Sequence, residues 1–468
     1  MCIFFCTFAA NMGKYVDTYY FLGIGGIGMS ALARYFAAKG YRVLGYDRIS
    51  SSLTRALEQE GIAVQYDESL EWVEALDVQK TIVVRTPAVP AEMPVYVYLR
   101  ENGFQILKRA ELLGLVTRSE CALCVAGTHG KTTTSTMLAH ILHQSHVGAN
   151  AFLGGIANNY GTNLLLDDSN VVVVEADEFD RSFHQLAPHI SVITSMDPDH
   201  LDIYGTEEAY RDSFEIYASL VDTALVVKRG LELHNKNFKA KVYTYAVNEM
   251  ADFYANHVLV ENGQIRFDFH TPKGNIKDIQ LGVPVWVNVE NGVAAMAVAW
   301  LMGAEEEELR EGMRSFAGVY RRFNIHLNTP QVAYVDDYAH HPMELLASIE
   351  SVRRLYPDRH VIGVFQPHLF SRTRDFVDEF ATVLSNLDEV ALLPIYPARE
   401  KPILGVTSEW LMKKILTKRA LVLPQVLPKY LRERVESCLK FGKHCVVITM
   451  GAGDIDRLVD DITKTLTI

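Results

Sequence analysis

The sequence predicts an α/β protein built from three consecutive Rossmann-like or P-loop-like domains with mostly parallel sheets. Short apolar strands alternate with helical stretches along most of the 468 residues, a pattern typical of parallel sheets covered by helices on both faces. Glycine-rich or charged loops follow several of these strands, and a chain of this length is too long for a single core. We place the domains at residues 12–115, 116–319 and 320–468.

The first predicted domain opens with a strand, a glycine loop and a helix. An apolar strand at residues 20–22 precedes Gly23-Ile-Gly-Gly-Ile-Gly28, which fits G-x-G-x-x-G, and a helical pattern covers residues 29–39. The next strand, residues 42–46, ends at Asp47, where a ribose-binding carboxylate is expected. The glycines allow a diphosphate to approach the helix N-terminus closely. The motif predicts a diphosphate nucleotide site, and a tight turn without a ligand is the alternative.

A short phosphate loop opens the second predicted domain, after a strand at residues 81–84 and helical stretches near 94–102 and 109–115. The strand 121–126 leads into Gly127-Thr-His-Gly-Lys-Thr-Thr133 and then a helix to about residue 143. Only two residues separate the glycines, whereas G-x-x-x-x-G-K-[ST] has four. Backbone N–H groups and the helix N-terminus attract phosphate oxygens, Lys131 adds a positive charge, and the Thr132 hydroxyl is placed for Mg²⁺. We expect a triphosphate site here.

Acidic clusters end two further strands of this domain. Residues 171–174 run into Glu175-Ala-Asp-Glu178, and residues 191–194 are followed by Asp197-Pro-Asp-His200. Glu175 is the best candidate for the carboxylate that a magnesium triphosphate site needs, with a solvated acidic turn as the alternative. The second cluster is a candidate for another metal ion, although histidine is an unusual partner for Mg²⁺. A β-rich stretch from about 223 to 285 predicts a small antiparallel extension, followed by a helix at 289–302.

Cationic loops characterise the third predicted domain. Strands are expected at residues 332–335, 361–365, 390–393 and 445–449. The loops near these strands carry cationic side chains, at Arg321, Arg322, His340, His341, His368, Arg372 and Arg374. Each one alone is more often a surface residue, but a set at three loop positions favours a site for carboxylate and phosphate groups.

Composition excludes several classes of protein. The net charge of −12, without a basic block, opposes nucleic-acid binding. The chain has no uninterrupted apolar run of about 18 residues, so no membrane span is predicted. The apolar residues 1–11 lack a basic region, which favours a disordered or mis-assigned start ahead of Met12 over a weak signal-like segment. We expect a cytoplasmic protein.

Taken together in this order, these motifs resemble the Mur ligases of bacterial cell-wall synthesis over nearly the whole chain from about Tyr19. The resemblance is closest to the first-step member, which joins L-alanine to UDP-N-acetylmuramate. It implies an ATP-dependent amide ligation: ATP phosphorylates the lactyl carboxylate, the amine of L-alanine attacks the acyl phosphate, and ADP and phosphate are released. The acidic and cationic loops suit such a transfer, because it needs positioning and charge neutralisation.

The resemblance also implies roles for individual residues. In the ATP site, the residues that would hold ATP are Gly127, Thr128, His129, Gly130, Lys131, Thr132, Thr133, Asn288, Asn291 and Asp337, and those that would hold Mg²⁺ are Thr132, Glu175 and His200. The residues expected to bind the substrates are Gly23, Gly25, Gly26, Gly28, Ser30, Asp47, Gly154, Gly155, Asn159, Arg321, Arg322 and His368. The residues expected to act in catalysis are Lys131, His200, His340 and Arg372. The third domain is expected to close on ATP and the amino acid.

Three positions depart from the patterns of the family or of its later-step members. Val287 stands where the family often has histidine, and Leu369 stands where many relatives have arginine, so Arg372 or Arg374 is expected to do more of the carboxylate binding. Phe214 aligns with the lysine of ligases that add later residues, which favours the first step.

Other functions remain open from the sequence. A recycling ligase that joins a tripeptide to the same acceptor is the nearest rival. A nicotinamide-dependent oxidoreductase would explain residues 23–28 and Asp47 but not the phosphate loop, and a non-enzymatic ATP-binding regulator would not explain the cationic loops. The oligomeric state, monomer or dimer, does not follow from the sequence.

Overall fold

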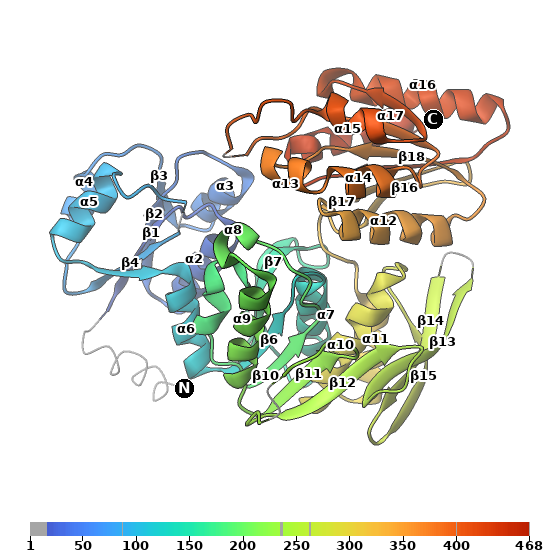
Figure 1. Ribbon diagram of the computed structural model, residues 1–468. Helices are drawn as coiled ribbons and strands as arrows, with labels where there is room; N and C mark the ends of the chain where they lie inside the picture. Colours follow the sequence, from blue (N-terminus) through green and yellow to red (C-terminus); the bar gives the residue numbers. More distant parts are fainter. Residues whose placement is uncertain (1–15, 87, 235–236, 262–263, 399, 468) are drawn as a thin grey trace. The chain divides into compact units, whose positions relative to one another are not determined.

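Three α/β sheets follow one another along the chain, which confirms the expected fold class (Figure 1). The computed structural model describes residues 16–467 except 87, 235–236, 262–263 and 399, so the expectation for residues 1–11 lies outside the described residues. Two compact units divide the chain, the first with Met1–Asn256, Asp268–Ile279 and Asn291–Phe316, the second with His257–Phe267, Gln280–Glu290 and Ala317–Ile468. Our three-domain boundaries stay a prediction.

The first sheet is five-stranded and parallel, in the order β3-β2-β1-β4-β5. Its strands are β1 (Thr18–Leu22), β2 (Arg42–Tyr46), β3 (Ala63–Gln65), β4 (Thr81–Arg85) and β5 (Gln105–Lys108). The accompanying helices are α2 (Ile27–Ala38), α3 (Ser52–Gln59), α4 (Glu71–Glu74), α5 (Pro94–Glu101) and α6 (Arg109–Ser119). Alternate residues of β1 enter two different apolar clusters, Tyr19 and Phe21 in one and Tyr20 and Leu22 in the other. Both faces of the sheet are therefore buried, which explains the continuous apolar run.

Ten strands make up the second sheet, in the order β15-β14-β13-β12-β11-β10-β6-β9-β7-β8. They are β6 (Cys121–Ala126), β7 (Asn150–Ala157), β8 (Thr162–Leu165), β9 (Val171–Ala176), β10 (Ile190–Ile193), β11 (Ala224–Lys228), β12 (Lys241–Val247), β13 (Phe253–Glu261), β14 (Gln264–Thr271) and β15 (Gly274–Gln280). Between and after them lie α7 (Lys131–His143), the 3₁₀ segment η1 (Phe179–Gln185), α8 (Leu201–Tyr204), α9 (Glu207–Ser219), α10 (Val287–Leu301) and α11 (Glu306–Ser315).

Parallel pairing extends through most of this sheet. The neighbours β13, β12, β11, β10, β6, β9 and β7 run parallel, whereas β8 is antiparallel to β7. The first three strands of the β-rich stretch are therefore parallel, and the expectation that the whole stretch is antiparallel was wrong for them. Because only two residues join the neighbouring strands β14 and β15, that pair can only be antiparallel. Carboxyl ends of the parallel strands meet at one edge, where the polar loops of the site emerge.

The third sheet has six strands, in the order β16-β17-β21-β18-β19-β20, and only β16 is antiparallel to its neighbour. Its strands are β16 (Asn324–Asn328), β17 (Val332–Asp337), β18 (His360–Phe365), β19 (Glu389–Leu392), β20 (Lys418–Leu421) and β21 (Cys445–Met450). Its helical segments are α12 (Pro342–Leu355), α13 (Phe370–Asp375), α14 (Val377–Leu384), α15 (Ser408–Lys414), η2 (Pro424–Val426), α16 (Leu427–Lys440), η3 (Asp454–Leu458) and α17 (Val459–Leu466).

Several strands extend further than their apolar residues suggest. Glu175 lies inside β9, and Asp337 is the last residue of β17, whereas the sequence placed both just after a strand. Parallel pairing with β6 and β21 continues through these polar positions, because the ladder bonds use the backbone and not the side chain. Among the helices that the structure describes, none combines the length and apolarity that crossing a bilayer demands.

Candidate active site

The short phosphate loop after β6 is held by the loop after β10. Gly127 has a φ of 139°, and a Cβ atom there would lie 2.0 Å from Thr194 Oγ1. The His129 amide donates a hydrogen bond to Ser195 Oγ at 2.8 Å, and its carbonyl accepts one from Thr194 Oγ1 at 2.5 Å. With two residues between the glycines, the His129 backbone reaches Thr194 and Ser195 at the end of β10. The short loop is therefore anchored by hydrogen bonds to the neighbouring strand.

Thr128 ties the same loop to α9. Its hydroxyl donates to the Asp197 carbonyl at 2.7 Å and lies 2.8 Å from the Tyr210 hydroxyl. Tyr210 is completely buried, and its ring lies edge-on to Tyr204, whose hydroxyl donates to the carbonyl of Glu178. The two tyrosines therefore connect the phosphate loop to the acidic segment after β9.

Tyr210→Phe is expected to lower kcat/KM for ATP about 5- to 10-fold, because a buried hydrogen bond that positions the loop contributes about 1 kcal/mol. Tyr217→Phe is the matched control: Tyr217 is equally buried on α9, but its hydroxyl lies 2.7 Å from Ser191 Oγ, away from the loop. Steady-state kinetics with varied ATP separate the two variants. Equal losses in both would mean that Tyr210 contributes only to general stability.

Lys131, the first residue of α7, is enclosed by acceptors. Its ammonium group lies 2.6 Å from Glu178 Oε2 and donates to the carbonyls of Gly127 at 2.6 Å and Thr128 at 3.3 Å. Both charged side chains are largely buried, at 13% and 3% exposure. The structure thus pairs the phosphate-loop lysine with Glu178, a member of the acidic cluster that the sequence did not single out.

Electrostatics keep this lysine charged. Burial alone lowers the pKa of the amine, but the carboxylates of Glu178, Asp177 and Glu175 outweigh that effect and raise it. Burial raises the pKa of Glu178 to about 7, an increase that the ammonium group partly offsets. The lysine therefore remains positively charged among these carboxylates and is able to bind phosphate oxygens.

One of the two predicted adenine-contacting asparagines lies against the phosphate loop. Asn291 Oδ1 accepts from Thr134 Oγ1 at 3.2 Å and would lie 2.8 Å from a Cβ at Gly130, whose φ is 81°. Asn288, also on α10, donates to the carbonyl of Val283 at 3.3 Å. Both asparagines are 6% exposed. Their contacts with adenine stay predictions.

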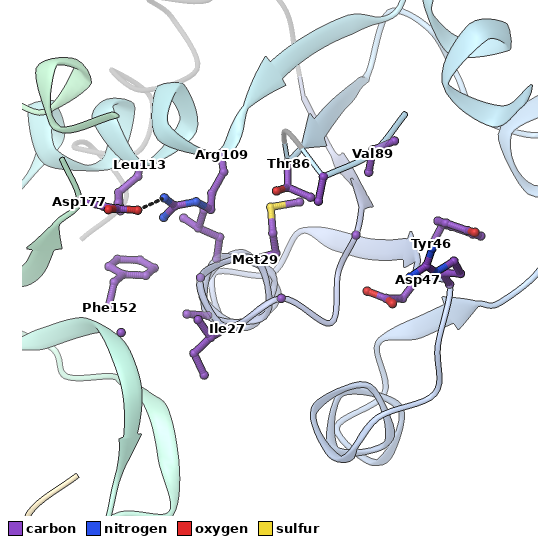
Figure 2. A pocket seen from close by; sticks show the side chains of 18 of the residues that line it. Ile27, Met29, Tyr46, Asp47, Thr86, Val89, Arg109, Leu113, Phe152 and Asp177 are labelled. Atoms are coloured by element: carbon purple, nitrogen blue, oxygen red, sulfur yellow. Dashed lines mark hydrogen bonds and ion pairs between the residues drawn. The ribbon is translucent and has the colours of Figure 1, made fainter. Parts of the chain in front are cut away.

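A cavity of about 700 Å³ joins the glycine loop to the acidic strand β9 (Figure 2). The predicted site residues on its wall are Gly23, Gly26, Gly28, Asp47, Gly154 and Glu175. Glu175 is also one of the carboxylates that raise the pKa of Lys131. The proposed sugar-nucleotide site and the phosphate loop therefore approach each other at Glu175, within the first compact unit.

Other predicted substrate residues make internal hydrogen bonds. Asp47 accepts from the amides of Gly25 at 2.8 Å and Ile49 at 3.2 Å, so it braces the glycine loop. Ser30 is buried and donates to the Ile27 carbonyl at 2.9 Å. Asn159 donates to the carbonyl of Ser315 at 2.8 Å, and Gly155 follows Gly154 within β7.

The residues predicted to hold Mg²⁺ offer mostly oxygen. Thr132, in the first turn of α7 beside Thr133, supplies a hydroxyl, and Glu175 supplies a carboxylate. A Cβ atom at Gly154 would lie 2.1 Å from Glu175 Oε2. Any other residue at position 154 would therefore clash with the carboxylate of Glu175. His200 lies edge-on to Phe179 with ring centroids 5.2 Å apart, and its amide donates to Asp199 at 2.8 Å. A hydroxyl and a carboxylate suit Mg²⁺, whereas the imidazole is the less usual ligand.

In the second unit, Arg321 acts as an internal tie. Its guanidinium lies 3.3 Å from Asp336 and donates to the carbonyls of Gly451 at 2.6 Å and Gly453 at 3.2 Å. It is 7% exposed. The guanidinium groups of Arg322 and Arg321 both lie over the ring of Tyr338, 5.0 Å and 5.2 Å from its centroid. Of the two arginines, Arg321 is committed to holding strands together and Arg322 remains the better candidate for a ligand.

Three of the predicted cationic residues of this unit, His368, Arg372 and Arg322, lie near His340. Its Nδ1 lies 3.2 Å from Glu344, and its ring centroid lies 6.0 Å from that of His368. Burial lowers the pKa of the imidazole, the Glu344 carboxylate opposes this, and Arg372 and Arg322 add to it. His340 is therefore neutral near pH 7 and stands among cations, an arrangement suited to binding a carboxylate.

Asp337, at the end of β17, is 8% exposed and accepts a hydrogen bond from the Ser348 hydroxyl. Burial raises its pKa to about 6, which the Ser348 hydrogen bond and Arg322 partly offset. The folded chain thus binds more protons here than the unfolded chain between about pH 4 and 6. Stability consequently falls as the pH rises through this range.

We expect Asp337→Asn to raise the free energy of unfolding at pH 7.5 by about 2 to 3 kcal/mol, the value of a pKa shift of this size. Asparagine has nearly the same shape and still accepts from Ser348. At pH 4 the gain should vanish, because the native carboxyl is then protonated. Urea unfolding at both values of pH checks this, and an equal gain at both would contradict the assigned pKa.

Sequence reasoning missed several residues of this site. Glu178 lies in the same acidic cluster as Glu175, three residues further along the chain. This proximity was the only sequence signal that it could belong to the site. Arg109, which lines the cavity, and Tyr210 gave no signal, because a lone arginine or tyrosine at a helix is ordinary. Tyr396, whose ring stacks on His368 at 5.8 Å between centroids, was also missed.

Comparison with known proteins gives one family over the chain. Its models match as the Mur ligase family catalytic domain at residues 18–120, the Mur ligase middle domain at 125–299 and the Mur ligase glutamate ligase domain at 321–453. The UDP-N-acetylmuramate–L-alanine ligase of Parabacteroides distasonis is 53% identical, over 96% of this chain and 97% of its own length, and that of Phocaeicola vulgatus is 54% identical, over 96% and 97%. The solved UDP-N-acetylmuramate-alanine ligase of Thermotoga maritima has a TM-score of 0.79 at 26% identity, over 96% of this chain and 98% of that one.

Proposed function

Since this chain belongs to the Mur ligase family, we propose that it joins L-alanine to UDP-N-acetylmuramate in an ATP-dependent reaction of peptidoglycan precursor synthesis. One observation carries the proposal: Glu175 and Gly154 line the same cavity as the glycine loop, and Glu175 also lies within electrostatic reach of Lys131. A nucleotide sugar held by the glycine loop would thus extend its acid end toward the γ-phosphate of ATP.

The reaction proceeds through two covalent steps. An oxygen of the lactyl carboxylate attacks the γ-phosphorus, the bond to the β-phosphate oxygen breaks, and ADP leaves. The amine of L-alanine then attacks the acyl carbon, and the tetrahedral intermediate expels phosphate while the nitrogen loses a proton. Lys131 would hold the γ-phosphate oxygens against the charge that develops during transfer. Thr132 and Glu175 would hold one Mg²⁺, and Glu175 and His200 a second; bound there, the ions would supply positive charge to the phosphate oxygens.

Residues of the second unit would serve the amino-acid end. The cluster of His340, His368 and Arg372 suits the carboxylate of L-alanine, with Arg322 nearby, and a neutral His340 is able to accept the proton of the attacking amine. Asp337 would reach ATP. We expect the domain that carries them to close on the nucleotide during turnover, a change that scattering with and without ligands would detect.

A panel assay tests the function. The protein is incubated with ATP, Mg²⁺ and UDP-N-acetylmuramate, together with L-alanine, glycine, L-serine or the cell-wall tripeptide, and phosphate release and product mass are measured. We expect phosphate release and an alanyl product with L-alanine. A product with the tripeptide alone would identify the recycling ligase, and activity that needs a nicotinamide cofactor would overturn the proposal.

A further inference from the structure

The cavity of the first unit contains one partly buried cation whose role the motifs do not assign. Among the described residues that line it, the charged side chains are Asp47, Arg48, Glu68, Arg109, Glu175 and Asp177. Arg48 is exposed, whereas the Arg109 side chain is only 25% exposed. A site with this many carboxylates repels an anion unless cations stand close to it.

Arg109 lies beside the position that an anionic ligand would occupy. It is the first residue of α6, directly after β5, so it shares the carboxyl edge of the parallel sheet with the glycine loop after β1. A Cβ atom at Gly28 would lie 3.0 Å from Arg109 Nη1. The missing side chain at Gly28 thus lets the guanidinium lie against the first turn of α2, whose N-terminus attracts phosphate.

Among the described residues, Arg109 makes one ion pair, and it is weak. Arg109 Nη2 lies 3.5 Å from Asp177 Oδ2, and that carboxylate is 41% exposed (Figure 2). Ion pairs of this exposure contribute about 0 to 1 kcal/mol, so a dianionic ligand competes with them easily. Asp177 also accepts from the amide of Phe179 at 3.2 Å, which keeps the carboxylate in place when the arginine leaves it.

We propose that Arg109 binds the diphosphate of the nucleotide-sugar substrate and that Asp177 pairs with the guanidinium until the substrate displaces it. This inference rests on the proposed function for the identity of the sugar nucleotide. A guanidinium offers two parallel N–H donors to phosphate oxygens, and together with the N-terminus of α2 it encloses the diphosphate from two sides. Arg109 is then a determinant of affinity for diphosphates in this cavity.

Calorimetry with UDP, without ATP or Mg²⁺, tests the assignment. Arg109→Ala is expected to raise the Kd for UDP about 10- to 100-fold, the loss expected for charged hydrogen bonds, and Arg109→Lys should recover part of it. Asp177→Asn should lower the Kd up to about fivefold, because the arginine no longer has to leave a carboxylate. Arg118→Ala is the matched control, since Arg118 lies on the same helix outside the cavity and donates to the carbonyl of Gln185.

Three outcomes would overturn the proposal. The first is an unchanged Kd for UDP in Arg109→Ala. The second is a loss with UDP-N-acetylmuramate but not with UDP, which would assign Arg109 to the lactyl carboxylate. The third is an equal loss of ATP affinity, which would indicate a general structural defect. Loss of UDP binding in Arg109→Ala together with a wild type that releases no phosphate with L-alanine would uphold this inference and refute the proposed function.

Discussion

Lys131→Ala is expected to reduce ATP-dependent phosphate release by about 1,000-fold or more. The ammonium group is the cation at the first position of α7, and it would face the γ-phosphate when that group carries the most charge. UDP binding in the cavity should stay within about twofold of the wild type, because Lys131 does not line it. Phosphate release and UDP calorimetry on the same preparation measure both effects.

Loss of this lysine leaves a buried carboxyl without its cation. Glu178 is 2% exposed and lies 2.6 Å from Lys131, so the single variant is also expected to lose stability. The double variant Lys131→Met with Glu178→Gln removes both charges and should recover that stability without recovering activity. Turnover in the double variant within tenfold of the wild type would show that Lys131 has no role at the γ-phosphate.

Gly127→Ala is expected to abolish activity with ATP for a different reason. The new Cβ atom would lie 2.0 Å from Thr194 Oγ1 and 2.9 Å from the Ser195 amide, and a φ of 139° is one that alanine rarely adopts. The loop must therefore move away from the strand end that holds His129. We expect kcat/KM for ATP to fall at least about 100-fold, and ATP binding by calorimetry to fall with it.

Gly161→Ala provides the matched control. Gly161 also has a positive φ, of 66°, but no atom lies within 4 Å of its would-be Cβ. It therefore carries the backbone cost of about 1 kcal/mol without the clash. Melting temperature and ATP kinetics should show a small loss of stability and unchanged kinetics. Normal ATP kinetics in Gly127→Ala would refute the anchoring of the loop by Thr194 and Ser195.

Local patterns were enough for the architecture. Strand and helix bounds such as Arg42–Tyr46, Cys121–Ala126 and Lys131–His143 agree with the periodicity and the loop glycines, because burial on both faces leaves an apolar run that is visible in sequence. Six strands were missed. The strands β3, β5, β8, β16 and β20 lie at sheet edges, where partial exposure weakens that pattern. The strand β7 lies inside its sheet and was missed as well.

The partners of individual side chains were harder to predict from the sequence. Asp47 lies on the cavity wall, and its two carboxylate oxygens accept backbone amides of the glycine loop and of its own turn. Its contact with a ribose stays a prediction. Arg321 was expected at a ligand and instead joins β17 to the loop after β21. A sequence shows that a charged residue follows a strand, but the choice between a ligand and a neighbouring backbone depends on distances that only the folded chain sets.

The sequence by itself determined three α/β sheets, a short phosphate loop, an acidic cluster after β9 and cationic loops in the last third of the chain, because each depends on residues that are close in sequence. Only the tertiary structure decided that Glu178 is the partner of Lys131, that Tyr210 and Ser195 hold the loop, and that Arg109 stands beside Gly28. These pairs join separate strands and helices, and their contacts depend on the order and register of strands in the sheets.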